Sequence, residues 1–173
     1  MVRAYIDSDL EAVVSCFGQS VREIGAGYYA REQISAWAPD NPDMDAWANR
    51  LRAGGVFVAD EGGEVVGFVR VEDNGFVDLL YVHSEYARRG VGRALLEVAS
   101  SWAVARGARK LESEVSIAAR PLFEAMGFCV EKEQFVERGG VGFRNLRMAR
   151  NADAEQAHAA DRQQPALPPA AGR

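Results

Sequence analysis

The sequence has no long hydrophobic run, only two cysteines and no excess of positive charge. No apolar stretch approaches the roughly 20 residues that a membrane-spanning helix needs, and the N-terminal segment lacks the apolar region of a signal peptide. The cysteines, Cys16 and Cys129, lie far apart and match no metal-ligand spacing, so we expect free, buried thiols and no metal site. These absences predict a soluble, cytoplasmic protein that does not bind a membrane.

The balance of charge and the length limit the class of protein further. The chain has 20 Lys and Arg against 25 Asp and Glu, a net charge of −5, whereas binding of nucleic acid needs basic surface. With 173 residues, 48% of them hydrophobic, the chain is long enough for one domain with a buried core. We expect this domain over residues 1–150. The tail at 151–173 is rich in Ala, Gln and Pro and lacks aromatic residues, which predicts disorder.

The order of strands and helices predicts the fold class. Apolar alternation indicates strands, and apolar residues spaced three or four apart indicate helices. The centre reads strand, helix, strand, helix, strand, flanked by hairpins. This order predicts an α/β fold with a mixed, mostly antiparallel sheet, one parallel crossover and flanking helices. We expect strands at 2–6, 56–60, 64–71, 76–83, 110–116, 128–137 and 141–150, and helices at 10–17, 28–37, 44–51, 91–106 and 119–126.

Two of the predicted helices have further sequence signals. The first follows "SDLE", Ser8 to Glu11, which is a capping-box pattern. In the helix at 91–106, we expect the buried stripe to consist of Val91, Leu95, Val98 and Trp102.

The stretch "EYARRGVGRALLEVA", Glu85 to Ala99, concentrates positive charge just before a helix. The first N–H groups of a helix have no partners within it, and the helix dipole is positive at this end. Gly90 and Gly92 remove side chains, so a bulky anion can approach the backbone. The stretch therefore predicts a phosphate site. The alternative is that Gly90 only turns the loop and the arginines are solvated.

Two segments together resemble a known family. "LLYVHSEYARRGVGRALLEVA" (79–99), followed by "SIAARPLFEAMGF" (116–128), is similar to the GNAT superfamily of acetyl-coenzyme A dependent N-acetyltransferases. Within the superfamily, "YYAREQISAWAP" and "FRNLRMAR" resemble a bacterial subgroup of the YafP type. The resemblance implies a single GNAT-type domain, acetyl-coenzyme A as cosubstrate and a small primary amine as acceptor. The amine would attack the thioester directly in a ternary complex.

The resemblance also implies where coenzyme A binds. Its pyrophosphate would lie on the N–H groups of residues 89–93. The pantetheine arm would pair like an extra strand with residues 80–82, and residues 116–123 would line its other side. The thioester carbonyl would accept an N–H near Val82. The implied cofactor-binding residues are Leu80, Tyr81, Val82, Arg88, Arg89, Gly90, Val91, Gly92, Arg93, Ser116 and Phe123.

Two positions depart from the family's pattern. Ala87 stands where the family carries Gln or Arg, and Phe123 stands where many members carry a tyrosine as general acid. A phenylalanine has no proton to give. A thiol has a pKa of about 8.5, so the thiolate is a tolerable leaving group near neutral pH. We therefore expect Phe123 to serve as an apolar wall beside the thioester.

The attacking amine must be neutral, so a base is expected near the acetyl group. Asp78 and Glu114 each interrupt an apolar strand, where a carboxylate is costly unless it is paired or used. Both are candidate bases. Alternatively each is a structural ion-pair partner, in the case of Glu114 with Arg120 or Arg144. For His83 we expect a loop or surface role, with a role as the base as the alternative. For Cys129 we expect a core thiol rather than an acyl-accepting nucleophile.

The resemblance implies that the helical segment within 18–52 covers the substrate mouth. Tyr28 or Tyr29 is predicted to line an aromatic acceptor pocket, the alternative being that most aromatic residues of this segment belong to the core. Glu23, Glu32 and Asp40 are candidates for attracting a cationic amine. Acetylation of a protein N-terminus or lysine is an alternative, as is a non-catalytic acyl-coenzyme A binding or sensor module. We expect a monomer or a homodimer, since the final hairpin offers a sheet edge.

Overall fold

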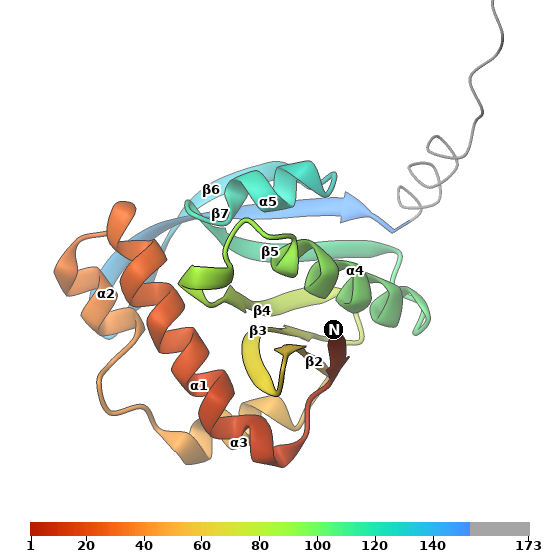
Figure 1. Ribbon diagram of the computed structural model, residues 1–173. Coiled ribbons are helices and arrows are strands. Elements are labelled where there is room, and N and C mark those ends of the chain that lie inside the picture. Colours follow the sequence, from red (N-terminus) through yellow and green to blue (C-terminus); the bar gives the residue numbers. More distant parts are fainter. Residues whose placement is uncertain (153–173) are drawn as a thin grey trace, which may run out of the picture.

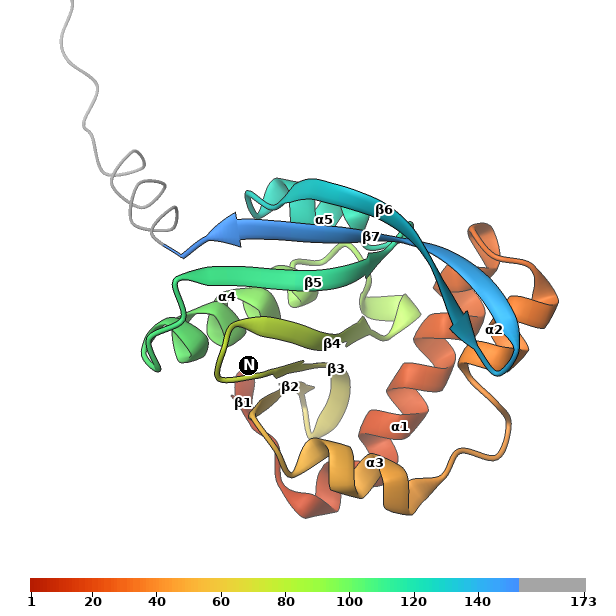
Figure 2. The same ribbon diagram turned by 180° about the vertical axis from the view of Figure 1, so that it is seen from behind.

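The centre of the molecule is a seven-stranded sheet with the strand order β1-β2-β3-β4-β5-β7-β6 (Figures 1 and 2). The computed structural model describes residues 1–152. Neighbouring strands are antiparallel except for β4 and β5, which are parallel and are joined by the crossover helix α4. The predicted fold class is confirmed.

Most predicted elements are present, with bounds that differ by a few residues at the ends. The strands are β1 (Val2–Ala4), β2 (Gly55–Glu61), β3 (Glu64–Val71), β4 (Phe76–Val82), β5 (Lys110–Ser116), β6 (Cys129–Arg138) and β7 (Val141–Asn151). The helices are α1 (Leu10–Gln19), α2 (Arg31–Trp37), α3 (Met44–Leu51), α4 (Val91–Val104) and α5 (Arg120–Ala125).

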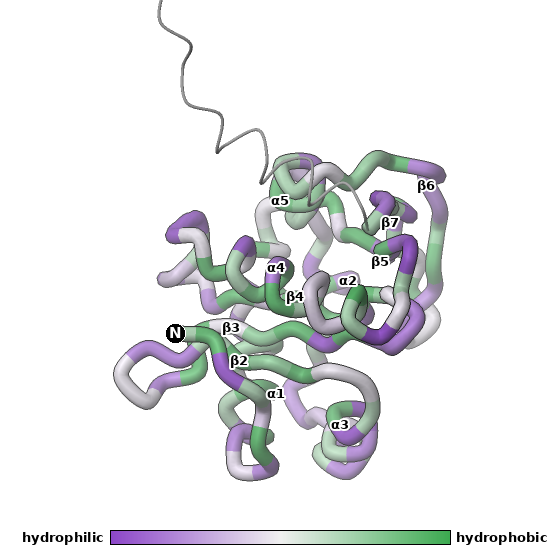
Figure 3. Tube along the Cα trace, turned by 90° about the vertical axis from the view of Figure 1, so that its right-hand side faces the viewer, coloured by the Kyte–Doolittle hydropathy of each residue, from purple (hydrophilic) through white to green (hydrophobic). Residues whose placement is uncertain are grey.

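Apolar side chains are buried on both faces of the sheet. Phe68 and Val69 are successive residues of β3, so they point to opposite faces. Phe68 packs in a cluster with α1 and α3, and Val69 packs in a second cluster with α4 and α5. In Figure 3 the hydrophobic colour follows the central strands, whereas the turns between them are mostly hydrophilic. The sheet is therefore covered by helices on both faces.

The start of α1 differs from the prediction. A 3₁₀ turn at Asp7–Asp9 precedes the helix, and Ser8 does not cap it. Asp9 instead accepts the N–H of Ile6 at 3.0 Å and forms an ion pair with Arg3 at 2.7 Å. A carboxylate that is already fixed by an arginine satisfies this N–H better than a serine hydroxyl does.

The buried face of α4 is also displaced from the predicted stripe. Val91, Val98 and Trp102 are only half-buried. The small residues of the helix allow its close approach to the sheet, and the ring of Trp102 lies over Gly55, where an added Cβ would come within 2.6 Å of it. The buried apolar positions are Leu95, Leu96, Ala99 and Ala103.

Two further expectations concern the thiols and the C-terminal segment. Cys16 is buried, but Cys129 is exposed, so the prediction of a core thiol at Cys129 is wrong. It begins the edge strand β6, much of which faces solvent. β7 continues to Asn151, and the N–H of Ala152 donates to the Arg109 carbonyl at 2.9 Å. The disordered tail stays a prediction, because residues 153–173 lie outside the described part of the chain.

Within residues 1–152, none of the helices is both long enough and apolar enough to cross a membrane. In the same part of the chain, His, Cys, Asp and Glu side chains do not gather in any group of three or more that would hold a metal ion.

Candidate active site

β4 and β5 pair over only two positions. Phe76 lies opposite Glu112 and Val77 lies opposite Ser113, and no pairing between these two described strands continues beyond them. The Ser113 hydroxyl donates to the Val77 carbonyl at 2.8 Å and closes this end of the junction. One backbone edge of residues 78–82 is therefore left without a strand partner, and this edge includes residues 80–82, with which the pantetheine arm is predicted to pair.

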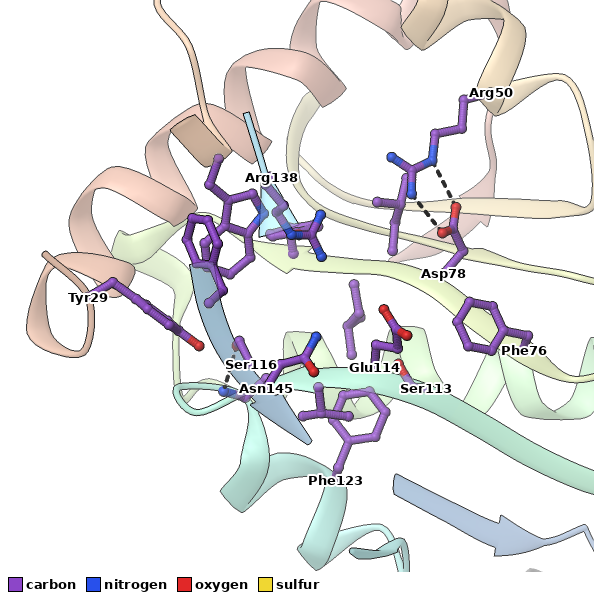
Figure 4. Close-up of a pocket in the computed structure, with 17 residues that line it drawn as sticks. Tyr29, Arg50, Phe76, Asp78, Ser113, Glu114, Ser116, Phe123, Arg138 and Asn145 are labelled. Carbon is purple, nitrogen blue, oxygen red and sulfur yellow. Dashed lines mark hydrogen bonds and ion pairs between the residues drawn. The ribbon is translucent and has the colours of Figure 1, made fainter. Parts of the chain in front are cut away.

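A β-bulge at Asp78 begins where the pairing ends. Val71 of β3 lies opposite Val77, but Arg70 lies opposite Leu79, so Asp78 is the extra residue. A bulge of this kind changes the direction of a side chain. Here it directs Asp78 toward α3, where it meets Arg50 (Figure 4).

Both carboxylate oxygens of Asp78 are occupied by arginines. Arg50 donates to Oδ1 at 2.6 Å and to Oδ2 at 2.9 Å, and Arg70 donates to Oδ2 at 2.6 Å. Burial acts to raise the pKa of Asp78, but the two guanidinium groups outweigh it and hold this pKa below its usual value. Asp78 is therefore an ionised anchor between β4, β3 and α3, and it is a poor proton acceptor.

Glu114 lies across the gap on β5, and its carboxylate points into a cavity (Figure 4). Gln134 donates to Oε1 at 2.9 Å. The two arginines considered as its partners pair elsewhere, Arg120 with Glu124 at 2.7 Å and Arg144 with Glu133 at 2.7 Å. The ion-pair alternative for Glu114 is therefore wrong, and no cation within residues 1–152 forms an ion pair with it.

The cavity has a volume of about 200 Å³ and opens between β4, β5, β7 and α2. One wall is aromatic, with Tyr29, Trp37, Tyr81 and Phe143 in contact through tilted and edge-to-face rings. Leu80, Ser116 and Phe123 also line it, and their contact with the pantetheine arm stays a prediction. Its polar side chains include Arg50, Asp78, Glu114, Arg138 and Asn145 (Figure 4).

Of the two tyrosines predicted for the acceptor pocket, Tyr29 lines the cavity. Its hydroxyl accepts the N–H of Ile117 at 3.0 Å and donates to the Arg144 carbonyl at 3.4 Å, and burial raises its pKa. Tyr28 is 55% exposed and lies outside the lining.

The acids considered for attracting an amine, Glu23, Glu32 and Asp40, also lie outside the cavity lining. Glu23 accepts the Ser84 hydroxyl, and Asp40 pairs with Arg22 at 3.6 Å.

Three residues of the last hairpin line the cavity although no sequence pattern singled them out: Arg138, Phe143 and Asn145. The alternation of side chains along the hairpin predicts which residues share a face of the sheet. It would have indicated these residues only if the register against β5 were known, in which Asn145 lies opposite Ser116.

The predicted phosphate site lies at the N-terminus of α4. Arg88 and Gly90 have positive φ angles of 62° and 87°, and the Ala94 N–H donates to the Gly90 carbonyl at 3.0 Å. The preceding N–H groups of the first turn have no partners within the helix. His83 lies beside this loop, where its Nδ1 accepts the Glu85 N–H at 3.2 Å.

Gly92 occupies the point where α4, β4 and α5 converge. An added Cβ would lie 2.8 Å from Leu122 Cδ2 and 3.6 Å from Val82 Cγ2. A side chain at this position would fill this space. The glycine therefore leaves room for a ligand that extends from the phosphate loop toward the open edge of β4. The arginines near Gly92 make contacts with neighbouring side chains. A guanidinium nitrogen of Arg93 lies 3.9 Å from Glu97 Oε1, and the guanidinium of Arg89 lies over the ring of Tyr86.

Phe123 is 2% exposed, and its ring lies edge-to-face against Phe128 with centroids 5.0 Å apart. It lines the cavity as an apolar wall, and its place beside the thioester stays a prediction.

Replacing Phe123 by Ala should lower the free energy of unfolding by about 3–5 kcal/mol, because the change leaves a cavity beside Phe128. Denaturant titration of the purified variant measures this loss. Phe135→Ala is the matched control, because its ring is 79% exposed and its removal should have little effect. Phe123→Tyr is expected to keep activity. If wild type acetylates no amine while Phe123→Tyr does, the apolar-wall role is wrong.

Comparison with known proteins places this geometry in a family. The model of an acetyltransferase (GNAT) domain matches residues 26–150. The chain belongs to the GNAT acetyltransferase family. It is 35% identical over 148 residues to the N-acetyltransferase YafP of Escherichia coli strain K12, covering 85% of this chain and 93% of YafP. The predicted family and the predicted enzyme class are thereby confirmed.

Solved GNAT structures agree with this assignment. A GCN5-related N-acetyltransferase from Rhodopseudomonas palustris superposes with a TM-score of 0.84 at 30% identity, covering 87% of this chain and 94% of that one. PaiA N-acetyltransferase from Thermoplasma acidophilum, solved with coenzyme A, has the same fold with a TM-score of 0.72 at 19% identity. The match covers 87% of this GNAT chain and 98% of the PaiA chain.

Proposed function

We propose that this GNAT acetyltransferase transfers an acetyl group from acetyl-coenzyme A to the primary amine of a small molecule, which attacks directly in a ternary complex. The observation that carries the proposal is the continuity of three features: the phosphate loop at Gly90, the open edge of β4 after Val77, and the cavity that contains Glu114. A donor on the loop side and an amine in the cavity would meet at the split between β4 and β5.

The donor side is formed by backbone groups and small residues. Free N–H groups at the start of α4 would hold the pyrophosphate, and the unpaired edge of residues 80–82 would hydrogen-bond the pantetheine amides as a strand does. Acetyl-coenzyme A supplies the activated acetyl group of this family. Phe123 would exclude water from the thioester.

On the acceptor side, Glu114 would remove the ammonium proton, directly or through water. The amine nitrogen then forms a bond to the acetyl carbon while the carbon–sulfur bond breaks. The bonded nitrogen then loses its second proton to water, Glu114 returns the first proton to solvent, and coenzyme A departs as a thiolate that water protonates. Asp78 stays ionised between Arg50 and Arg70 and holds the bulge in place.

The walls of the cavity favour a small acceptor. α2 and the β6–β7 hairpin approach each other here, since Gln33 donates to the Gly142 carbonyl at 2.9 Å and Tyr29 donates to the Arg144 carbonyl. A protein N-terminus or lysine would have to enter a space of about 200 Å³. Cytoplasmic location and a monomeric or homodimeric state stay predictions.

The test is release of free thiol from acetyl-coenzyme A with a panel of small primary amines, followed by mass spectrometry of the product. We expect acetyl-coenzyme A to stabilise the protein by about 2.7 kcal/mol at 100 times its dissociation constant, and at least one amine to gain an acetyl group. Stabilisation without transfer to any amine or peptide would identify a binding module instead. No stabilisation at millimolar ligand would refute the donor site.

A further inference from the structure

The four charged side chains that line the cavity do not pair completely with one another. Arg50 is engaged by Asp78 at two points, and Asp78 is also bound by Arg70, so these two lining groups are already paired. Arg138 and Glu114 remain, one cationic and one anionic, and neither has an ion-pair partner within residues 1–152. The cavity therefore presents one positive and one negative group to whatever enters it.

Arg138 is the last residue of β6, and its guanidinium points into the space between the aromatic wall and Glu114 (Figure 4). It lies over the ring of Trp37 at 5.6 Å from the centroid, which holds the group by a cation–π contact. Burial raises the pKa of Tyr81, and the charge of Arg138 opposes this rise. The guanidinium thus sits among aromatic rings with its hydrogen-bond donors available.

Asn145 supplies a second unpartnered polar group. Its side chain is 5% exposed, and Oδ1 has no hydrogen-bond partner within the described residues. Asn145 lies on the same face of the sheet as Glu114, because it pairs with Ser116 two residues further along β5. A buried carbonyl oxygen without a donor is costly, and an ammonium group between Asn145 and Glu114 would satisfy it.

We propose that the acceptor is a small amine that carries a carboxylate, in the manner of an amino acid. The guanidinium of Arg138 binds the carboxylate, while Glu114 and Asn145 Oδ1 bind the ammonium group that is acetylated. The proposal rests on the proposed function and extends it from an amine of any kind to a zwitterion.

The arrangement selects a monoanion over a phosphate monoester. A single guanidinium matches a carboxylate with two parallel hydrogen bonds. A phosphate dianion would call for a second cation, but the other arginine of the cavity is held by Asp78. Glu114 in the same cavity would also repel the extra charge.

Paired substrates that differ only in the negative charge test the proposal. α-, β- and γ-Amino acids are each compared with their own carboxamide, which has the same amine and no negative charge, and with phosphoethanolamine. We expect kcat/KM for the preferred amino acid to exceed that of its carboxamide by about 10- to 100-fold, the range of a charged hydrogen-bonded pair. Phosphoethanolamine should be the poorer anion.

Variants assign the effect to one residue. Arg138→Gln should raise KM for the amino acid by about 10- to 100-fold and leave KM for the carboxamide unchanged, while Arg138→Lys should restore part of the loss. Arg144→Gln is the matched control, because this arginine lies on the adjacent strand β7 and pairs with Glu133 outside the cavity lining.

Calorimetry of the amino acid binding to the complex with coenzyme A gives a readout without turnover, and Arg138→Gln should weaken that binding by the same factor of about 10 to 100. If wild type acetylates carboxamides as well as acids, or if Arg138→Gln affects both alike, the carboxylate subsite is refuted while acetyl transfer stands. Preference for phosphoethanolamine also refutes it. If no amine is acetylated and no acid binds, both the subsite and the proposed function fail.

Discussion

Replacing Glu114 by Gln should lower kcat by about 10²- to 10⁴-fold, the usual contribution of a positioned proton acceptor. The substitution keeps the length and the hydrogen-bonding capacity of the side chain, so Gln134 retains a partner. The negative charge is lost, and with it both the attraction for the ammonium group and the ability to take its proton, so the measurement is made where the amine saturates. Steady-state thiol release at saturating amine measures the effect, and the stabilisation by acetyl-coenzyme A should stay close to that of wild type.

Two further variants test whether the loss of kcat is specific to Glu114. Glu112→Gln is the matched control, because Glu112 lies two residues earlier on β5, pairs with Lys110 and Arg147, and lies outside the cavity lining. Asp78→Asn should mainly destabilise the fold, since it leaves Arg50 and Arg70 without their shared carboxylate. Wild-type kcat in Glu114→Gln would show that Glu114 is not the base.

Replacing Gly92 by Glu should abolish the stabilisation by acetyl-coenzyme A. The side chain would enter the space between α4, β4 and α5, where even a Cβ comes within 2.8 Å of Leu122. Its charge would also stand at the end of the helix that is meant to receive an anion. Thermal melts with and without ligand measure the loss.

The control must separate blocked binding from a damaged fold. Gly92→Gln adds nearly the same volume without charge, so the difference between the two variants isolates the electrostatic part. Gly142→Glu is a surface control, because an added Cβ there meets nothing within 4 Å. Normal stabilisation of Gly92→Glu by the ligand would refute a phosphate site at this loop.

Much of the donor side could be predicted because its signals are local in the sequence. The glycines at positions 90 and 92 and the arginines around them indicate an anion site within six residues. Phe123 follows from a short motif in the same way. In the proposed donor site backbone groups would do most of the binding, and a backbone conformation depends mainly on neighbouring residues.

The acceptor side could not be predicted in the same way, because its residues meet only through the sheet register. Arg138 and Asn145 belong to the last hairpin, and nothing near them in sequence indicates that they face Glu114. The sequence also could not show that Asp78 is an ion-pair anchor whereas Glu114 is a candidate base, because this difference depends on the position of Arg50 of α3 in the fold. Sequence placed both carboxylates at the split but did not distinguish the anchor from the candidate base.

The two paired positions between β4 and β5 have a mechanical consequence. The sheet consists of a four-stranded segment and a three-stranded segment, held edge to edge by Phe76–Glu112, Val77–Ser113 and one hydroxyl bond. A ligand that hydrogen-bonds along the free edge of β4 and contacts β5 would connect the two segments where their strand pairing is absent. A ligand in the gap would then add hydrogen bonds across this junction and stiffen the sheet there.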